Sequence, residues 1–291
     1  MKPLSKNVRR TYLVLLILLF VVLVPVTVLY SAGYRVGEHF TIVKTGGIYI
    51  GLNEPGARLF LNGKFIKRAS ILKNGFFLQD LTPRVYHVAV EKDGFLKWEK
   101  VLEVKPQHVV EASAFILPQE VPLEDILPVS AERNGSVGNQ EYVSIQALFA
   151  TSTTATSISL YDIPGIFATS TQGRRITDIK KKGDIVLWRE GDGVFARWVS
   201  DRGNAPSYFC EGLRCDKEIR INKTSIDFFD FYPNSNELVV IKTPEGIHVT
   251  EIDPRIPRNI KPLYLGKDAR VRVLGDAIFI TGEERLFRVA L

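Results

Sequence analysis

The two cysteines are the residues whose spacing most directly suggests chemistry. Cys210 and Cys215 enclose a short segment that contains Gly212. A glycine in so short a loop suits a hairpin tip, and thiols facing each other across such a tip can form a disulfide in an oxidising compartment. Two free thiols are the alternative, and zinc is disfavoured because no second ligand pair stands at a suitable spacing. The spacing therefore predicts a possible disulfide between Cys210 and Cys215.

Short sequence matches to enzyme motifs do not combine into a catalytic site. Ser70 and Lys73 match Ser-x-x-Lys, and residues 44–46 match Lys-Thr-Gly, two motifs of penicillin-binding proteins in which the lysine activates the serine. Here their order is reversed and the surrounding pattern is one of strands and turns, so we reject the match. The four histidines have no metal-ligand spacing and no nucleophile partner; they are His39, His87, His108 and His248. We predict no catalytic, cofactor-binding or metal-binding residue, and the ligand-binding residues stay unknown.

A long uncharged segment near the N-terminus determines on which side of a membrane the rest of the chain lies. Residues 11–34 carry no charge, and four Lys and Arg side chains lie within residues 2–10. As a helix rising about 1.5 Å per residue, the run reaches roughly 36 Å and spans a hydrocarbon core of about 30 Å. Cations on the short N-terminal side favour a cytoplasmic N-terminus. We predict a cytoplasmic tail (1–11), a signal-anchor helix in the lipid bilayer (12–34) and an extracytoplasmic C-terminus in a single-pass cell-membrane protein.

A cleaved signal peptide is the alternative to an anchor. Its apolar region usually spans about 7–15 residues and ends at a small-x-small site. The run here is longer, and its candidate site begins with the bulky Tyr30 in Tyr30-Ser31-Ala32. The uncleaved anchor is therefore favoured.

Part of the net charge of +6 reflects membrane topology, because the cations within residues 2–10 supply four of these charges. The remainder of the chain is close to neutral, whereas nucleic-acid binding needs a dense basic face. We predict no nucleic-acid partner. The basic runs at 174–175 and 180–182 could contact an anionic envelope polymer, but solvated turns are the simpler interpretation.

Residues 42–117 show short alternating strands separated by turn residues. Asn62-Gly63 and Asp93-Gly94 stand between alternating apolar residues, and both dipeptides tolerate the positive φ of tight hairpins. Several strands at this spacing predict an antiparallel β-sandwich.

The same region resembles the PEGA family, which is named for a Pro-Glu-Gly-Ala turn. The segments that carry the resemblance match its strand with a Gly-Lys turn, its Leu-x-Pro-Gly-x-Tyr-x-Val segment and its Gly-Tyr-x-x-Trp segment; they are residues 56–64, 81–90 and 92–98. Glu54-Pro55 inverts the first two letters of the turn, and Arg84 replaces a usual glycine. The lead-in at 42–50 resembles bacterial members with one helix before the module. The resemblance implies a β-sandwich that serves as a binding or spacer module in the cell envelope.

Phe95 and Trp98, in the last of these segments, raise a ligand hypothesis because exposed aromatic rings stack on sugars. Packing in the core of the last hairpin is the simpler interpretation for both.

Residues 118–139 are rich in proline, glycine and asparagine and read as a linker. Beyond it, three segments align without gaps, each with an acidic residue, a strand, a four-residue turn and a second strand; they are 184–196, 237–249 and 276–288. Such repeats bury their faces by stacking, as propeller blades do. Residues 140–291 are too short for more than about four blades, so we predict a β-propeller-like repeat domain that is possibly incomplete.

The repeats make a detailed prediction. Leu187, Val240 and Phe279 should occupy equivalent buried positions, and the turns at 189–192, 242–245 and 281–284 should be exposed. The change of pattern around the linker predicts two independently folding β-domains, with no helix longer than about two turns after Ala32.

The sequence thus predicts a mainly β protein with a transmembrane helix, a PEGA-like sandwich (42–117) and a propeller-like domain (140–291). We expect a non-enzymatic binding or scaffolding function toward an envelope protein or glycan, without a cofactor and with no prediction of oligomeric state. A small glycan-processing enzyme with an unrecognised carboxylate site is the alternative. Clustered carboxylates facing an aromatic-lined pocket between the domains would favour the enzyme, and a smooth, closed surface would favour binding.

Overall fold

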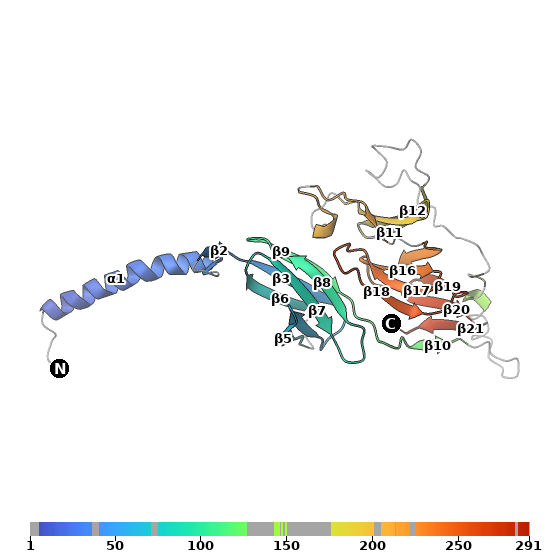
Figure 1. Ribbon diagram of the computed structural model, residues 1–291, viewed down its shortest axis with the longest axis horizontal. Helices are drawn as coiled ribbons and strands as arrows, with labels where there is room; N and C mark the ends of the chain where they lie inside the picture. Colours follow the sequence, from blue (N-terminus) through green and yellow to red (C-terminus); the bar gives the residue numbers. More distant parts are fainter. Residues whose placement is uncertain are drawn as a thin grey trace.

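The protein is described by a computed structural model (Figure 1). The residues that it describes are 6–36, 41–70, 75–126, 143–145, 147, 149, 176–200, 205–212, 214–221, 225–282 and 285–290. They form one long helix and six β-sheets, so the protein is mainly β as predicted. Figure 1 shows the helix projecting from one end of the β region.

The helix α1 (Lys6–Ser31) contains no buried residue and is apolar along most of its length. It is long and apolar enough to cross a membrane. Its end at Ser31 precedes the predicted residue 34, because the chain turns at Gly33, whose φ is +80°. A short hairpin of β1 (Tyr34–Val36) and β2 (Ile42–Lys44) then leads into the sandwich.

The sandwich, residues 46–114, consists of two sheets packed face to face. The three-stranded sheet has the order β6-β3-β9, and the four-stranded sheet has the order β5-β4-β7-β8. The strands are β3 (Gly46–Leu52), β4 (Arg58–Leu61), β5 (Lys64–Arg68), β6 (Gly75–Leu81), β7 (Val85–Glu91), β8 (Trp98–Glu103) and β9 (Val109–Ala114). β3 pairs antiparallel with β6 but parallel with β9, so the prediction of a wholly antiparallel sandwich is wrong for this pair. The connection from β3 to β9 runs through the other sheet and is long enough for a parallel pairing.

The hairpin signals are confirmed in the four-stranded sheet. Asn62 and Gly63 have φ values of 51° and 77° between β4 and β5, the positive values that a tight hairpin turn requires. Gly94 has a φ of 78° at the turn before β8. Alternation buries one face of several strands of the sandwich, including Ile48 and Ile50 of β3, whereas the edge strand β5 has no buried residue.

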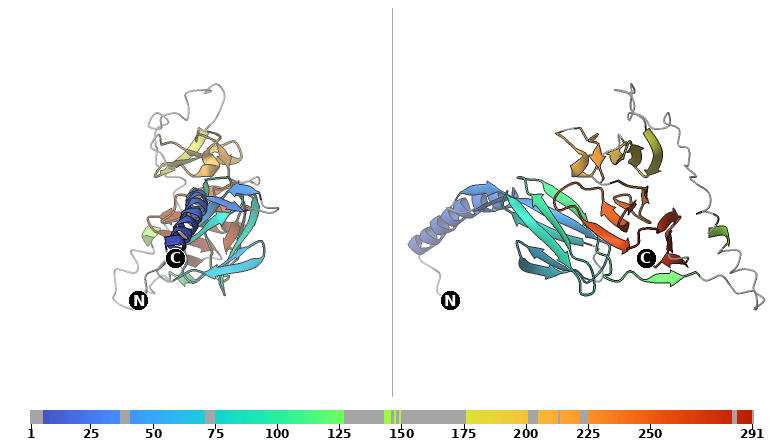
Figure 2. Two further views of the ribbon diagram at one scale, coloured as in Figure 1. Left: turned by 90° about the vertical axis from the view of Figure 1, so that its left-hand side faces the viewer. Right: turned by 45° about the vertical axis from the view of Figure 1, so that its right-hand side comes forward.

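The repeat region, residues 123–125 and 176–290, contains three four-stranded sheets stacked on one another (Figure 2). The first stacked sheet contains β11 (Ile176–Lys182), β12 (Ile185–Glu190), β13 (Gly193–Trp198) and β14 (Ile219–Arg220). The second contains β15 (Phe228–Phe231), β16 (Leu238–Thr243), β17 (Gly246–Glu251) and β18 (Ile260–Tyr264). The third contains β19 (Arg270–Leu274), β20 (Ala277–Gly282), β21 (Arg285–Val289) and β10 (Leu123–Asp125). All strand pairs in these sheets are antiparallel.

The predicted equivalence of Leu187, Val240 and Phe279 is confirmed. Each is the third residue of the second strand in its meander, and each is buried. Leu187 packs in a cluster with residues of the second stacked sheet, and Val240 packs in a cluster with residues of the third. Phe279 packs on the helical residues Ile145 and Phe149. Leu187 and Val240 therefore each pack toward the stacked sheet that follows in the chain, whereas Phe279 packs on residues that precede the first stacked sheet in the chain.

The predicted turns are shorter than four residues. The pairs Glu190↔Gly193 and Thr243↔Gly246 close two-residue turns, so Lys242 is still within β16 and is buried, contrary to the prediction. Its Nζ donates to Thr243 O at 2.7 Å and to a second carbonyl. The tip of the third turn, 283–284, lies outside the described residues.

The predicted linker contains a strand of the repeat region. β10, at residues 123–125, pairs with β21 and so joins the third stacked sheet; the part of the linker beyond residue 126 lies outside the described residues. One hydrophobic cluster also runs from Trp98 in the sandwich to Val240 and Val289 in the repeat region. The two β modules therefore share a core instead of being separated. Among the described residues there is no closed barrel or propeller.

Candidate binding site between the two β modules

A buried ion pair fixes the sandwich against the repeat region. The side chain of Lys100, on β8, is 0% exposed and pairs with Glu251 at the end of β17. Its Nζ also donates to Arg255 O at 2.9 Å and lies 3.7 Å from Asp253 Oδ2. Trp98 Nε1 donates to the second oxygen of Glu251 at 3.2 Å. We call this group of residues, with Asn259, the junction.

Partners from the repeat region complete the junction. Asn259 donates its backbone N–H to Glu251 at 2.8 Å and its side-chain N–H to Glu99 O at 2.9 Å. Arg255 holds Asp253 through its Nε and Nη2 at 2.9 and 2.6 Å. Burial raises the pKa of Glu251, and Lys100 and Asn259 oppose that rise. Because each charge has several partners, the junction holds the modules in one register and leaves no reactive group free.

A cleft with a volume of about 640 Å³ lies between the modules. The sandwich lines it with the end of β3, the turn that follows it, Phe95 and residues 113–118. The repeat region lines it chiefly with 232–238, the loop between β15 and β16. Its volume falls within the range of about 300–1,000 Å³ that is usual for ligand pockets.

The cleft contains two carboxylates and two half-buried aromatic rings, Phe95 and Tyr232. Glu54 pairs with Lys92 Nζ at 2.8 Å, and this Nζ also lies 4.2 Å from the centre of the Phe95 ring. Glu237 accepts from the Tyr208 hydroxyl at 2.8 Å and from Ser113. Both carboxylates are therefore already bound by protein groups.

Burial and the charge of Glu237 raise the pKa of Tyr208, so it remains a neutral donor. Arg255 from the junction lies 5.7 Å from the centre of the Tyr208 ring. The ring thus connects the junction to the wall of the cleft.

Three polar side chains in the cleft make no hydrogen bond to another described residue. They are the Tyr232 hydroxyl and the amides of Asn234 and Asn236. Burial, with the charge of Glu54, raises the pKa of Tyr232 to about 12, so the hydroxyl stays protonated at neutral pH. These groups can donate to and accept from a ligand.

The structure separates the two aromatic residues that the sequence raised as ligand contacts. Phe95 lines the cleft, whereas Trp98 is 0% exposed within the junction. Core packing is thus correct for Trp98. Phe95 is partly buried and also packs against this core, and its place in the lining of the cleft keeps it a ligand candidate.

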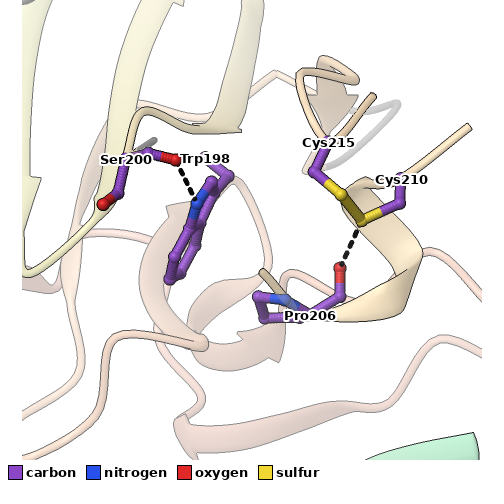
Figure 3. Close-up of a disulfide and its surroundings, with 5 residues drawn as sticks. All are labelled: Trp198, Ser200, Pro206, Cys210 and Cys215. Atoms are coloured by element: carbon purple, nitrogen blue, oxygen red, sulfur yellow. Dashed lines mark hydrogen bonds between the residues drawn. A yellow bond between two sulfur atoms is a disulfide. The ribbon is translucent and has the colours of Figure 1, made fainter. Parts of the chain in front are cut away.

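The cysteine pair does not line the cleft. Cys210 and Cys215 form a disulfide, at the place where the spacing predicts one (Figure 3). Glu211 N donates to Arg214 O at 2.7 Å inside the loop, and Gly212 has a φ of 64°, so the bridge closes a tight turn. Cys210 Sγ lies 3.8 Å from Pro206 O.

The described residues contain no cluster of metal-ligating side chains. His87 and His248 lie on separate strands, β7 and β17. Ser70 is exposed outside any strand, and residues 44–46 lie at the ends of β2 and β3. His39 and Lys73 fall outside the described residues.

Sequence reasoning missed Lys100 and Glu251, although a signal was present. Trp98, Lys100 and Leu102 alternate along β8 and share its buried face, and Val249 and Glu251 alternate in the same way on β17. A charged residue at an inward position of a strand needs a partner. Two such positions of opposite charge would have suggested the junction.

No protein-family model and no curated protein matches the sequence. A solved structure described as the AfRom2 CNH domain is similar with 14% sequence identity, over 77% of this chain and 69% of that chain. Its TM-score is 0.25, which is too low to support a conclusion about fold or function.

Proposed function

We propose that this chain is a membrane-anchored envelope protein whose two β modules form a non-catalytic unit that binds or scaffolds an envelope protein or glycan. The observation that carries the proposal is the cleft, because both modules build its walls and the junction holds them together. A binding site whose walls are fixed before the ligand arrives loses less entropy on binding.

Membrane anchorage is supported by α1. All its described side chains are exposed, although those from Tyr12 onward are mostly apolar. A bilayer removes this surface from water, and the cations before and at the start of the helix favour a cytoplasmic N-terminus. The β modules would then lie outside the cytoplasm, where the disulfide can persist.

Two finer assignments accompany this proposal. Three stacked four-stranded meanders, with β10 pairing the last strand, support a propeller-like arrangement of the repeat region. The hairpin turns at Asn62-Gly63 and Gly94 support the PEGA-like character of the sandwich.

A glycan-processing enzyme is the second candidate, because carboxylates and aromatic rings do line a cleft between the modules. General acid–base catalysis needs carboxyl groups that can exchange protons with the substrate. Glu54 is paired with Lys92, and Glu237 accepts two hydroxyl hydrogen bonds. These contacts favour a binding role.

The proposal can be tested with the full-length protein in detergent micelles. We expect it to capture an envelope component, and Ser235→Trp, which fills the cleft, to lose that component. Gln79→Trp, on an exposed position of β6, is the matched control. Equal capture by the two variants would refute a role for the cleft. Release of new reducing ends from envelope glycan by the wild type, abolished by Glu237→Gln, would establish the enzyme instead.

A further inference from the structure

We infer that the cleft between the modules binds an uncharged oligosaccharide, with Phe95 and Tyr232 against the sugar rings and Asn234 and Asn236 bonding its hydroxyls. The inference rests on the proposed binding function and names the ligand class of the same cleft.

The charges of the cleft argue against an anionic ligand. The lining contains the carboxylates of Glu54 and Glu237 and no lysine or arginine. Glu54 is paired with Lys92, but an anionic polymer would meet the negative charge of Glu237 here. A cationic ligand would gain little, because Glu54 already has Lys92 as its counter-ion and Glu237 is bound by two hydroxyl groups.

The chemistry of the lining matches sugar hydroxyls. A sugar hydroxyl both donates and accepts, as do the hydroxyl of Tyr232 and the amides of Asn234 and Asn236. Carboxylates retain further lone pairs beyond those already used, so Glu54 and Glu237 can accept additional hydroxyl donors. The apolar face of a pyranose needs an aromatic or aliphatic surface, which Phe95 and Tyr232 supply.

A peptide strand fits less well. Peptides that join a β-protein usually pair with the backbone of a free strand edge. The walls here include Pro118, Pro122 and Pro233, which have no backbone N–H, and much of the remaining lining is turn and loop. The edge strand β9 contributes only its last two residues, Ser113 and Ala114, so the cleft offers side chains more than a backbone edge.

The test is titration of the full-length protein with defined oligosaccharides, followed by saturation-transfer NMR and calorimetry. The protein is held in a phosphocholine detergent, because maltoside detergents are themselves sugars. The uncharged probes are the tetrasaccharides of N-acetylglucosamine, glucose (β-linked and α-linked) and mannose. Tetragalacturonate and tetralysine are the charged probes.

We expect one uncharged tetrasaccharide to bind, and Phe95→Ala to weaken it by about fivefold or more. Phe77→Ala removes an aromatic ring on the exposed face of β6 and should leave binding unchanged. If Phe95→Ala fails to fold, Asn234→Ala at an exposed loop position gives the same comparison.

The inference is overturned if no uncharged probe binds, if a charged probe binds more tightly, or if Phe95→Ala and Phe77→Ala behave alike. When Ser235→Trp still abolishes capture of an envelope component but no sugar binds, the proposed function stands and only the ligand class is wrong. When Ser235→Trp does not change capture and no sugar binds, both the proposed function and the inferred ligand class are wrong.

Discussion

Lys100 and Glu251 show what one buried ion pair can do between two β modules. Removing both charges from water is costly, so the pair need not add net stability. Its effect is to fix the register in which the sandwich meets the repeat region. An apolar interface can slide by a residue, whereas Lys100 reaches its two acceptors, on Glu251 and Arg255, and the nearby carboxylate of Asp253 only in one register of β8.

The first prediction separates the cost of breaking this pair from the net contribution of the intact pair to the free energy of unfolding. Lys100→Met should lower the free energy of unfolding by about 3–5 kcal/mol, because it leaves the Glu251 carboxylate buried without its cation. Lys100→Met combined with Glu251→Leu should recover much of that loss. Denaturant unfolding followed by tryptophan fluorescence measures both. Equal losses in the single and double variants would contradict this account.

The second prediction concerns pH. Because the pKa of Glu251 is raised above its ordinary 4.5 in the folded protein, the folded state binds a proton that the unfolded state has released. The free energy of unfolding should therefore fall as the pH rises above 4.5, by at most about 1.4 kcal/mol per pH unit for this group. Glu251→Gln should flatten that part of the stability profile, and Glu211→Gln, at an exposed side chain, should not. Stability profiles of the same shape for the wild type, Glu251→Gln and Glu211→Gln would contradict this prediction.

At the scale of the element, the three stacked sheets depend on inward positions such as Val240. Val240→Asp should destabilise the repeat region by about 4 kcal/mol or more, because it buries a carboxylate without a partner. Leu274→Asp changes an exposed position of β19 and should cost little. Because Val240 belongs to the cluster that both modules share, the sandwich should lose protection where it faces the repeat region, and its two sheets should stay folded if the modules fold independently. Hydrogen exchange resolved by peptide distinguishes the two modules.

The disulfide makes a weaker contribution. So short a loop restricts the unfolded chain little, and Cys210→Ser should lower the free energy of unfolding by about 2 kcal/mol. The variant should still fold. Peptide mapping without reductant should recover Cys210 and Cys215 joined in material from the envelope; two freely alkylated thiols would reject the bridge.

Features that depend on neighbouring residues could be predicted from the sequence, whereas features that depend on distant contacts could not. The hairpins at Asn62-Gly63 and the equivalent places of Leu187, Val240 and Phe279 follow from turn residues and from a period of two, which are properties of neighbouring residues. The parallel pairing of β3 with β9 and the pairing of β10 with β21 depend on distant contacts, which no local pattern encodes. The cleft was missed for the same reason, because its two walls come from different modules.

At the scale of the whole molecule, orientation is the prediction to check first. A reporter that is active only outside the cytoplasm, fused after Leu291, should be active. Moving the charges, as in Arg10→Asp with Gly37→Arg, should weaken this orientation. Arg68→Lys, which conserves charge within the sandwich, is the control. Labelling of the C-terminus from the cytoplasmic side would refute the topology.

The pairing of β10 with β21 has a mechanical consequence. Tension applied through a bilayer anchor would travel along α1 and the sandwich and enter the repeat region at β10. There Ala290 N donates to Pro122 O at 3.0 Å and Ile126 N donates to Leu286 O at 2.8 Å, on either side of the paired residues. The chain enters β10 beside the point where it leaves β21, so a load between the anchor and the C-terminus would have to unzip this pair before it reached the other strands of the stacked sheets.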